Sequence, residues 1–360
     1  MNKKIICSVV GARPQFIKLA PLSKQLQQSY NEVIIHTGQH YDKELSKIFF
    51  DTLNIPKPDY NLNVRSGTHG AQTGIMLAGL EKLFTKLKPK LVLVFGDTNS
   101  TLAGALAAAK MHIPVAHVES GMRSFNKKMP EERNRIITDH ISDILFCSTQ
   151  QSKRWLEQEN ITRNVHVVGD LMIDALMDHA KIAMADSHVI HDLNIKPKSY
   201  YLSTIHRAEN TDSKFRLENI LAALAKSNKR VILPLHPRTK KMIKKHGLSS
   251  YLHSKQLLVI PPVSYLDMLQ LEMNALKIAT DSGGIQKEAY FFKVPCVTLR
   301  DETEWLETVK GGWNVVTGVE KKKILNALRK SSTPRKHTAS YGSGNAAKKI
   351  VVWLNAFLSK

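Results

Sequence analysis

The sequence is poor in cysteine and contains no long apolar run. Its 360 residues include three cysteines, Cys7, Cys147 and Cys296, with no CxxC spacing and no even number that would pair them. Each lies in an apolar run, so we expect small core residues rather than disulfide or metal-binding residues. No stretch approaches the ~20 apolar residues of a membrane span, and the first residues lack the pattern of a cleaved leader. We therefore expect a cytoplasmic protein without membrane insertion.

Two common nucleotide-binding motifs are missing. No GxGxxG follows the first apolar run, and no GxxxxGK[ST] occurs anywhere. These absences argue against a dinucleotide cofactor of the usual kind and against a P-loop NTPase. The one HxxxH spacing, His36 to His40, has no HExxH glutamate and runs off a predicted strand end, so zinc is not expected. We expect neither a metal nor another cofactor.

Acidic residues are scarce relative to basic ones. Asp and Glu total 31 against 52 Lys and Arg, giving a formal net charge of +21. This balance admits nucleic acid, an anionic membrane surface or a phosphate-bearing substrate as partners. The basic runs, such as KKHGLSS and EKKKILNALRK, are short and have no interleaved aromatics, so we interpret them as solvated surface. We expect no nucleic-acid partner, and a nucleic-acid-binding module stays an alternative.

Short Val- and Ile-rich runs alternate with amphipathic stretches along the chain. Because most runs are apolar at nearly every position, they predict strands covered on both faces by helices, in parallel doubly wound α/β sheets. The length predicts two domains, and a polar, Pro-containing stretch places their boundary near residue 170, giving 1–170 and 171–345. The predicted strands are 4–11, 32–37, 90–96, 113–119, 143–148, 164–169, 200–205, 230–235, 257–261, 276–280, 295–299 and 313–317.

Ionisable residues follow many of these predicted strands. Ligands bind beyond the carboxyl ends of strands in open parallel sheets, so these residues are site candidates. Helix capping accounts equally well for Asp97, Thr98 and Ser282, because short polar side chains make good caps. We do not expect capping to account for the bulky or basic candidates, which are Arg13, Glu119, His206 and His236.

The segment TDSGGIQKEAYFF predicts a phosphate site. A strand delivers Ser282, Gly283 and Gly284 to a helix start, where free N–H groups and the positive end of the helix dipole favour an anion. Glu288 lies one turn further along and could accept hydrogen bonds from a ribose diol, which favours a nucleotide. A tight strand-to-helix turn without a ligand is the alternative.

The segment HVESGMRSFNKKMPEERNR predicts a cluster of carboxylates. Pro130 suits the first position of a helix, and dipole compensation alone would explain Glu132. If Asp97, Glu119 and Glu131 converge, their like charges raise the pKa of at least one carboxyl and supply both an acid and a base. Such a cluster would move protons.

The motifs together resemble one enzyme family. GARPQFIKLAPL, TGQHYD, GDTNSTLAGALAA, HVESGMRSFNKKMPEERNRIITDHISD, STIHRAEN, LPLHPR and TDSGGIQKEA, in this order, resemble the non-hydrolysing UDP-N-acetylglucosamine 2-epimerases over residues 4–318. The resemblance implies a GT-B-like architecture, in which two Rossmann-like domains face each other across a cleft and the last helix, 346–360, packs back on the first domain. It also implies a homodimer, no nicotinamide, and a UDP-sugar substrate.

The same resemblance assigns roles to individual residues. The family inverts C2 of a UDP-linked 2-acetamido sugar by eliminating UDP to a glycal and adding it back. The residues that match its catalytic positions are Asp97, Glu119, Glu131 and His206. Those that match its substrate-binding positions are Arg13, Lys18, Gln39, His40, Arg207, His236, Ser282, Gly283, Gly284 and Glu288. Among these, Arg207 and His236 match a second, regulatory sugar-nucleotide site.

The sequence departs from the common bacterial form in two motifs. It has GARPQ in place of GTRPE and Gly38-Gln39-His40-Tyr41 in place of AQHR, which puts regulation by a second sugar nucleotide in doubt. The segment GARPQFIK near the start of the chain, together with IPKPDYNLNV and SGTHGAQTG, is more similar to the branch of the family that acts on UDP-2,3-diacetamido-2,3-dideoxyglucuronate. We expect a 2-epimerase for surface polysaccharide such as O-antigen. A hydrolysing relative that releases free sugar and UDP, and a transferase of the same architecture, are the alternatives.

Overall fold

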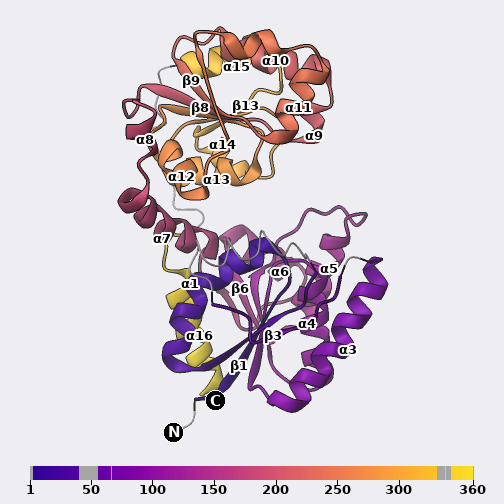
Figure 1. Cartoon of the computed structure of the whole chain (residues 1–360). Helices are drawn as coiled ribbons and strands as arrows, with labels where there is room; N and C mark the ends of the chain where they lie inside the picture. The colour runs from indigo at the N-terminus through magenta and orange to yellow at the C-terminus, as the bar shows by residue number, and fades with distance from the viewer. Residues whose placement is uncertain (1–2, 40–55, 66, 331–336, 338–341, 360) are drawn as a thin grey trace. The chain divides into compact units, whose positions relative to one another are not determined.

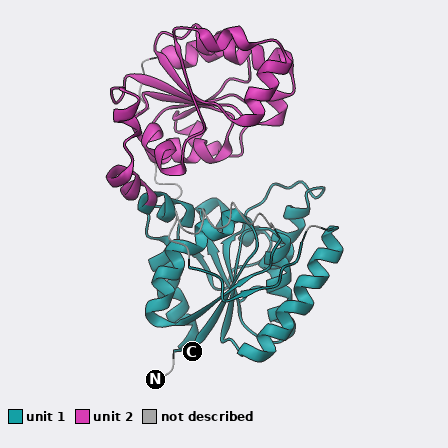
Figure 2. Ribbon diagram, in the orientation of Figure 1, with its two compact units in different colours: residues 1–178, 339–360 teal, residues 179–338 magenta. Residues whose placement is uncertain are grey.

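The structure, a computed structural model, describes residues 3–39, 56–65, 67–330, 337 and 342–359. The chain divides into two compact units (Figure 2). Unit 1 comprises Met1–Asp178 and Ala339–Lys360, and unit 2 comprises His179–Thr338. Among the described residues, no helix combines the length and the apolarity needed to cross a membrane.

Unit 1 is built on one parallel sheet (Figure 1). Its described strands have the order β3-β2-β1-β4-β5-β6-β7, in which the chain first builds to one side of β1 and then to the other. The register pairs Val9 with both Ile35 and Val94. The strands are β1 (Ile5–Val10), β2 (Asn31–His36), β3 (Tyr60–Asn61), β4 (Leu91–Phe95), β5 (Val115–Ser120), β6 (Ile144–Cys147) and β7 (Val165–Val167).

Helices cover the sheet of unit 1 because alternate strand residues need apolar contacts on both faces. Cys7 and Val9 of β1 pack in one core with Met76 and Phe84 of α3 and with Ala103 of α4. The last helix, α16, lies against α1, and Lys4 Nζ near the start of the chain donates to the Leu358 carbonyl at 2.6 Å. The helices are α1 (Arg13–Ser29), α3 (His69–Leu87), α4 (Asn99–Lys110), α5 (Pro130–Ile141), α6 (Gln150–Gln158), α7 (Leu171–Asp186), which continues into unit 2, and α16 (Ala346–Leu358).

Unit 2 repeats this architecture. Its described strands are parallel and have the order β10-β9-β8-β11-β12-β13, and two apolar cores form on its sheet, one with α10, α11 and α15 and one with α8, α12 and α13. The strands are β8 (Tyr200–Thr204), β9 (Arg230–Pro234), β10 (Leu257–Ile260), β11 (Lys277–Thr280), β12 (Cys296–Thr298) and β13 (Asn314–Val316). The helices are α8 (Val189–Asp192), α9 (Ala208–Thr211), α10 (Lys214–Ala225), α11 (Pro237–Lys245), the 3-10 helix η1 (Ser249–His253), α12 (Tyr265–Asn274), α13 (Gly283–Phe291), α14 (Leu306–Lys310) and α15 (Lys321–Arg329).

The α/β class with parallel doubly wound sheets is confirmed. Each of the twelve predicted runs contains a strand. Within the part of the chain that the structure describes, the sequence missed only β3, a strand of two residues that carries no periodic signal. The expected boundaries at 170 and 345 compare with unit boundaries after Asp178 and after Thr338. The strand order reverses beside β1 in unit 1 and beside β8 in unit 2. Ligand sites are expected at the carboxyl ends of β1 and β4 and of β8 and β11.

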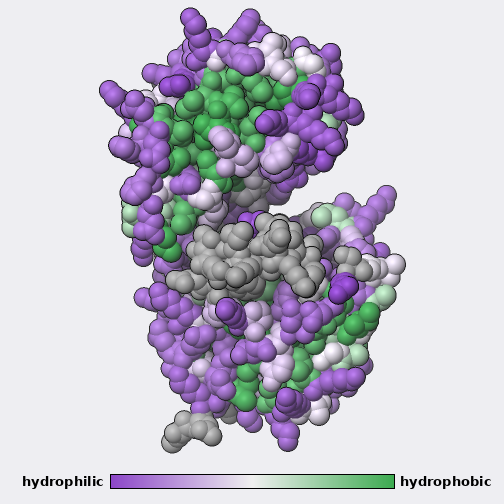
Figure 3. Space-filling model, viewed as in Figure 1, coloured by the Kyte–Doolittle hydropathy of each residue, from purple (hydrophilic) through white to green (hydrophobic). Residues whose placement is uncertain are grey.

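Figure 3 shows a broad hydrophobic area in the middle of the visible face of unit 2, bordered by hydrophilic side chains, and hydrophilic side chains interspersed with smaller hydrophobic areas on unit 1. The three cysteines have the predicted character of core residues. The thiols of Cys7, Cys147 and Cys296 are buried and unpaired. Burial raises the pKa of each to about 12, so these thiols stay protonated in the core.

Candidate functional site

Asp97 and Glu119 lie at the carboxyl ends of two neighbouring strands of unit 1, β4 and β5. Gly96, just before Asp97, has a φ of +66°, which favours glycine. A Cβ at Gly96 would lie 3.3 Å from Glu119 Oε2. Glycine at this turn therefore lets the Glu119 carboxylate approach the backbone that carries Asp97.

Glu119 forms an ion pair with Lys18 of α1. The two side chains are only 19% and 10% exposed. Burial alone would lower the pKa of Lys18, but the carboxylates of Glu119, Asp170 and Asp97 raise it above its ordinary value. Lys18 is thus a fixed cation among carboxylates, where it can offset negative charge.

The pKa of the Asp97 carboxyl lies above its ordinary value. Burial raises its pKa, and the nearby Glu119 raises it further, with a smaller contribution from Glu131. Arg135 and Lys18 oppose this rise. Arg135 of α5 also fixes the side chain, because its NH1 donates to Asp97 Oδ2 at 2.6 Å. A buried carboxyl whose pKa is raised further by a second carboxylate is the arrangement that the sequence predicted for proton transfer.

The two glutamates in the first turn of α5 serve different purposes. Glu131 is half-buried, and its charge acts on Asp97. Glu132 is buried and accepts hydrogen bonds from the N–H groups of Ser124 and Phe125 at 2.9 and 2.8 Å. Glu132 therefore holds the preceding loop, a tertiary role beyond compensation of the helix dipole.

The start of α1 is anchored by Gln15, one of the two residues at which this chain departs from GTRPE. Gln15 Oε1 accepts from the N–H groups of Gly11 and Ala12 at 2.8 and 2.9 Å, and its Nε2 donates to the Phe95 carbonyl at 2.7 Å. A glutamate could accept these bonds but not donate the third. Arg13, the first residue of α1, is exposed beside this anchored turn.

The region matching AQHR is described only in part. Gln39 Oε1 accepts from the N–H and the hydroxyl of Ser100 at 3.0 and 2.6 Å, so the Gln39 side chain is anchored to the start of α4. His40 lies outside the described residues.

In unit 2, His206 follows β8 and is oriented by Asp281, which follows β11. Asp281 is fully buried and accepts from the N–H groups of His206 and Arg207 and from Asn210 Nδ2, each at 3.1 Å. Burial would raise the pKa of Asp281, but the hydrogen bond and charge of His206 lower it below its ordinary value. Nδ1 of His206 lies 3.2 Å from this carboxylate, which leaves Nε2 as the ring nitrogen for a ligand.

The predicted phosphate site forms the start of α13. Ser282 is its N-cap and accepts from the Ile285 N–H at 3.4 Å. The first helical N–H groups, of Gly283 and Gly284, have no partner within the helix. A Cβ at Gly283 would lie 3.3 Å from Glu304 Oε1 and 3.8 Å from Arg207 NH2, so both a carboxylate and a guanidinium lie beside this helix start. The backbone donors and the Arg207 cation favour an anion here, whereas the Glu304 carboxylate, which lies 2.8 Å from Arg300 NH1, opposes it.

Glu288 lies one turn along α13 and receives a hydrogen bond from the Tyr265 hydroxyl at 3.1 Å. Burial raises the pKa of Glu288 to about 7, with Tyr265 and Lys287 opposing. The neighbouring Glu272 is fully buried, and burial followed by the charge of Glu288 raises its pKa well above the ordinary value. Glu288 therefore changes charge near neutral pH.

The structure corrects one expectation about His236. Its Nδ1 accepts from the Arg238 N–H at 3.2 Å, so His236 caps α11, a role that we had excluded for this bulky side chain. The cap works because the ring nitrogen, like a small oxygen, can accept from the helix start. The ring of His236 still lies 5.9 Å from that of His206.

Several residues that organise the site carried no separate signal in the sequence. Asp281 was one of many strand-end residues, and Asn134, whose Nδ2 donates to the Asp97 carbonyl at 2.9 Å, lies in a helix. His117 sits within an apolar strand and Asp139 within α5. Their partners are distant in sequence, so no local motif marks them.

Comparison with known proteins identifies close relatives. A family model described as UDP-N-acetylglucosamine 2-epimerase matches residues 24–355. The chain is 55% identical to a UDP-N-acetylglucosamine 2-epimerase homolog of Methanococcus maripaludis, over 96% of this chain and 98% of the relative. It is 46% identical to the UDP-2,3-diacetamido-2,3-dideoxy-D-glucuronate 2-epimerase of Pseudomonas aeruginosa, over 97% and 99% of the two chains.

A solved structure extends this similarity to three dimensions. The UDP-GlcNAc 2-epimerase of Methanocaldococcus jannaschii, in complex with UDP-GlcNAc and UDP, superposes with a TM-score of 0.77 at 46% identity. The match covers 99% of this chain and 100% of that one.

Proposed function

Because the chain belongs to the UDP-N-acetylglucosamine 2-epimerase family, we propose that the site residues described above carry out epimerisation at C2 of a UDP-linked 2-acetamido sugar. UDP-sugar 2-epimerisation is the activity of the family, and the enzyme is an isomerase. One observation carries the assignment of residues. The pKa of Asp97 is raised by burial and by the nearby Glu119, and Glu119 itself forms an ion pair with Lys18.

The proposed reaction eliminates UDP and adds it back. A carboxylate takes the C2 proton, the C1–O bond breaks, and UDP leaves with that electron pair to give a glycal. UDP oxygen then attacks C1 while an acid delivers a proton to the other face of C2. Of the unit 1 residues, Asp97, Glu119 and Glu131 exchange the protons, and Lys18 and Arg13 bind the sugar nucleotide.

The residues of unit 2 are proposed to bind the nucleotide part. Ser282, Gly283 and Gly284 hold the diphosphate at the start of α13, and His206, oriented by Asp281, stabilises it as it leaves. Glu288 accepts from the ribose diol. Arg207 and His236, with Gln39 and His40 of the first unit, are proposed as further sugar-nucleotide contacts.

Deuterium incorporation tests the route. In deuterated water, both recovered substrate and epimer are expected to carry deuterium at C2, because the intermediate is reprotonated from a solvent-exchanged acid. Mass spectrometry of UDP-N-acetylglucosamine and its 2,3-diacetamido glucuronate analogue, incubated separately, measures the label and also shows which sugar is converted. An unlabelled epimer would contradict elimination and readdition.

The same incubation separates the alternatives. A hydrolysing relative would accumulate UDP in step with free sugar, whereas the proposed epimerase returns UDP to the product. A transferase would turn over only when an acceptor is added.

The proposal includes a cytoplasmic homodimer that does not bind nucleic acid and feeds surface-polysaccharide synthesis. Analytical ultracentrifugation tests the dimer, and salt-sensitive retention on DNA would contradict the absence of nucleic-acid binding.

Ribose binding by Glu288 predicts a pH dependence. The pKa of Glu288 is about 7, so the carboxylate that accepts from both ribose hydroxyls is scarce at pH 6 and predominates at pH 8. If only the ionised form binds, UDP affinity rises about tenfold over this range. Isothermal titration calorimetry of wild type and Glu288→Gln isolates this effect, because the phosphate of UDP titrates alike with both proteins. Equal pH slopes for the two proteins would remove Glu288 from the ribose site.

A further inference from the structure

The backbone that carries the two carboxylates of unit 1 is unusual. Glu119 has a φ of +69°, which is rare outside glycine, and Gly121 has a φ of +74°. The pairing of β5 with β6 shifts register between Val118 and Ser120. Glu119 therefore occupies an irregular position that strand pairing alone does not specify, and neighbouring groups must hold it there.

His117, two residues before Glu119, reaches the turn that carries Asp97. Its ring is fully buried, with Nε2 2.8 Å from the Gly96 carbonyl oxygen and Nδ1 2.7 Å from Asp139 Oδ1. Both ring nitrogens thus lie within hydrogen-bond distance of an oxygen, one on the turn before Asp97 and one on α5. His117 thereby links the two strand ends.

Asp139 of α5 fixes the other side of Glu119. Its Oδ2 accepts from the Gly121 N–H at 3.1 Å and from Arg123 NH1 at 2.6 Å. Burial would raise the pKa of Asp139, but the charges and hydrogen bonds of His117 and Arg123 lower it below its ordinary value. The single Asp139 carboxylate thus binds groups both before and after Glu119.

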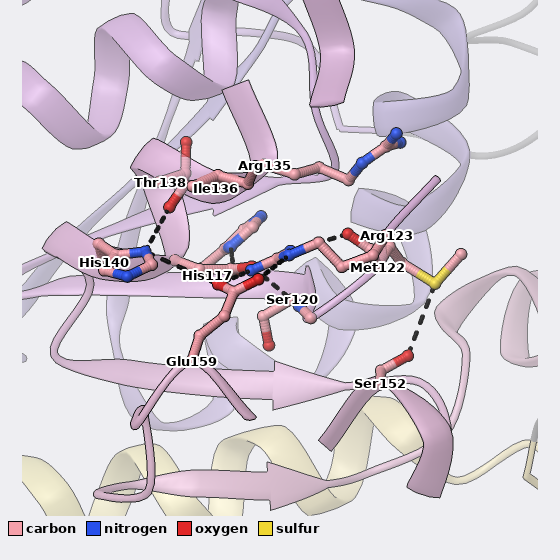
Figure 4. Close-up of polar contacts among 12 residues, drawn as sticks. His117, Ser120, Met122, Arg123, Arg135, Ile136, Thr138, His140, Ser152 and Glu159 are labelled. Atoms are coloured by element: carbon pink, nitrogen blue, oxygen red, sulfur yellow. Dashed lines mark hydrogen bonds and ion pairs between the residues drawn. The ribbon is translucent and has the colours of Figure 1, made fainter. Parts of the chain in front are cut away.

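The network continues outward to the surface. Arg123 Nε and NH2 each lie 2.7 Å from a Glu159 carboxylate oxygen, and Arg123 NH1 donates to the Met122 carbonyl at 2.8 Å. Figure 4 shows Arg123 and Glu159 meeting beside His117, with His140 at the edge. Glu159 Oε2 lies 3.9 Å from His140 Nδ1. Arg123 is therefore paired with two carboxylates, those of Asp139 and Glu159.

We propose that His117 and Asp139 are positioning residues that set the geometry of the Asp97 and Glu119 carboxylates. This inference rests on the proposed role of those carboxylates in epimerisation. Buried ion networks often stabilise no more than apolar residues of the same volume, so stability alone is a weak reason for this one. Displacement of a reacting group by about 1 Å can cost about 100-fold in rate.

Paired substitutions of His117 and Asp139 test the proposal. His117→Gln places an amide near the former Nε2 and keeps the link to Gly96, whereas His117→Asn places it near Nδ1 and keeps the link to Asp139. Each is expected to lower kcat at least tenfold, and Asp139→Asn about 100-fold. KM and UDP affinity are expected to change less than threefold, because unit 2 is proposed to hold the nucleotide.

Asp143→Asn is the matched control. Asp143 Oδ2 accepts from the Val115 N–H at 2.8 Å, so it holds the same strand, β5, at its opposite end. This variant is expected to keep kcat within twofold of wild type. If the His117 and Asp139 variants lower the unfolding temperature but keep kcat, the network is structural only and the proposal is overturned.

A crystal structure of Asp139→Asn separates this proposal from the proposed function. Failure of the wild type to convert either UDP-sugar would overturn the proposed function alone. In that case the φ of Glu119 and its pairing with Lys18 decide the inference. Loss of the positive φ or of the ion pair supports positioning by Asp139, and an unchanged backbone and ion pair overturn it. The same structure serves if the His117 variants do not fold.

Discussion

Asp97→Asn is expected to lower kcat for C2 epimerisation by about 100-fold or more while UDP affinity stays within about twofold. Removal of a general acid or base commonly costs 100-fold to 10,000-fold. The amide keeps the shape of the carboxyl and an oxygen for Arg135 NH1, which donates to Asp97 Oδ2 at 2.6 Å. The loss therefore reports on proton transfer rather than on folding. Chromatographic separation of the two epimers gives kcat, and calorimetry gives UDP affinity.

Asp59→Asn is the control for Asp97→Asn. Asp59 Oδ2 accepts from the Ile34 N–H at 2.8 Å, so this variant also converts an aspartate of unit 1 that bonds the protein into an amide. It is expected to keep kcat. Near-normal turnover in Asp97→Asn would leave its assignment without support.

Glu119→Gln is expected to match the rate loss of Asp97→Asn, with an additional loss of stability because Lys18 remains buried without its carboxylate.

Gly121→Ala is expected to destabilise unit 1 by about 3 kcal/mol or more. The φ of +74° costs a residue with a Cβ about 1 to 2 kcal/mol. The added Cβ would also lie 2.4 Å from the Ser152 carbonyl oxygen and 2.9 Å from Leu156 Cγ, so the start of α6 must move. Calorimetry is expected to show unfolding about 6 to 12 °C lower.

Gly74→Ala in α3 is the matched glycine. No atom lies within 4 Å of the Cβ that this substitution would add, and the residue is exposed in a helix interior. It is expected to stabilise unit 1 by about 0.5 to 1 kcal/mol, because alanine loses less backbone freedom on folding than glycine. If Gly121→Ala unfolds at the temperature of wild type, the backbone around Glu119 is not constrained as described.

The fold followed from the sequence because its signals are local. Each apolar run contains a strand, and Pro130 and Ser282 mark helix starts through their own geometry. The partners within the site were not local. His117 and Asp139 are separated by 22 positions and His206 and Asp281 by 75, so their contacts emerge only when the sheets assemble.

Side-chain roles were hardest to predict where one residue type serves two purposes. Glu131 and Glu132 are adjacent and chemically alike, yet the N–H groups of Ser124 and Phe125 engage only Glu132. His236 was excluded as a cap from residue preference alone, and the position of its Nδ1 overrode that preference. In both cases the conformation of the surrounding backbone decides the role of the side chain, and the sequence alone does not predict that conformation.

The return of α16 to α1 has a consequence for biosynthesis. Unit 1 contains the last 22 residues, Ala339–Lys360, whereas unit 2 ends at Thr338. At about 5 to 20 residues per second, a ribosome makes that final stretch roughly one to four seconds after it has finished the middle of the chain. Unit 1 is thus completed only after unit 2 has been made, and until then the surface of α1 that contacts α16 stays uncovered.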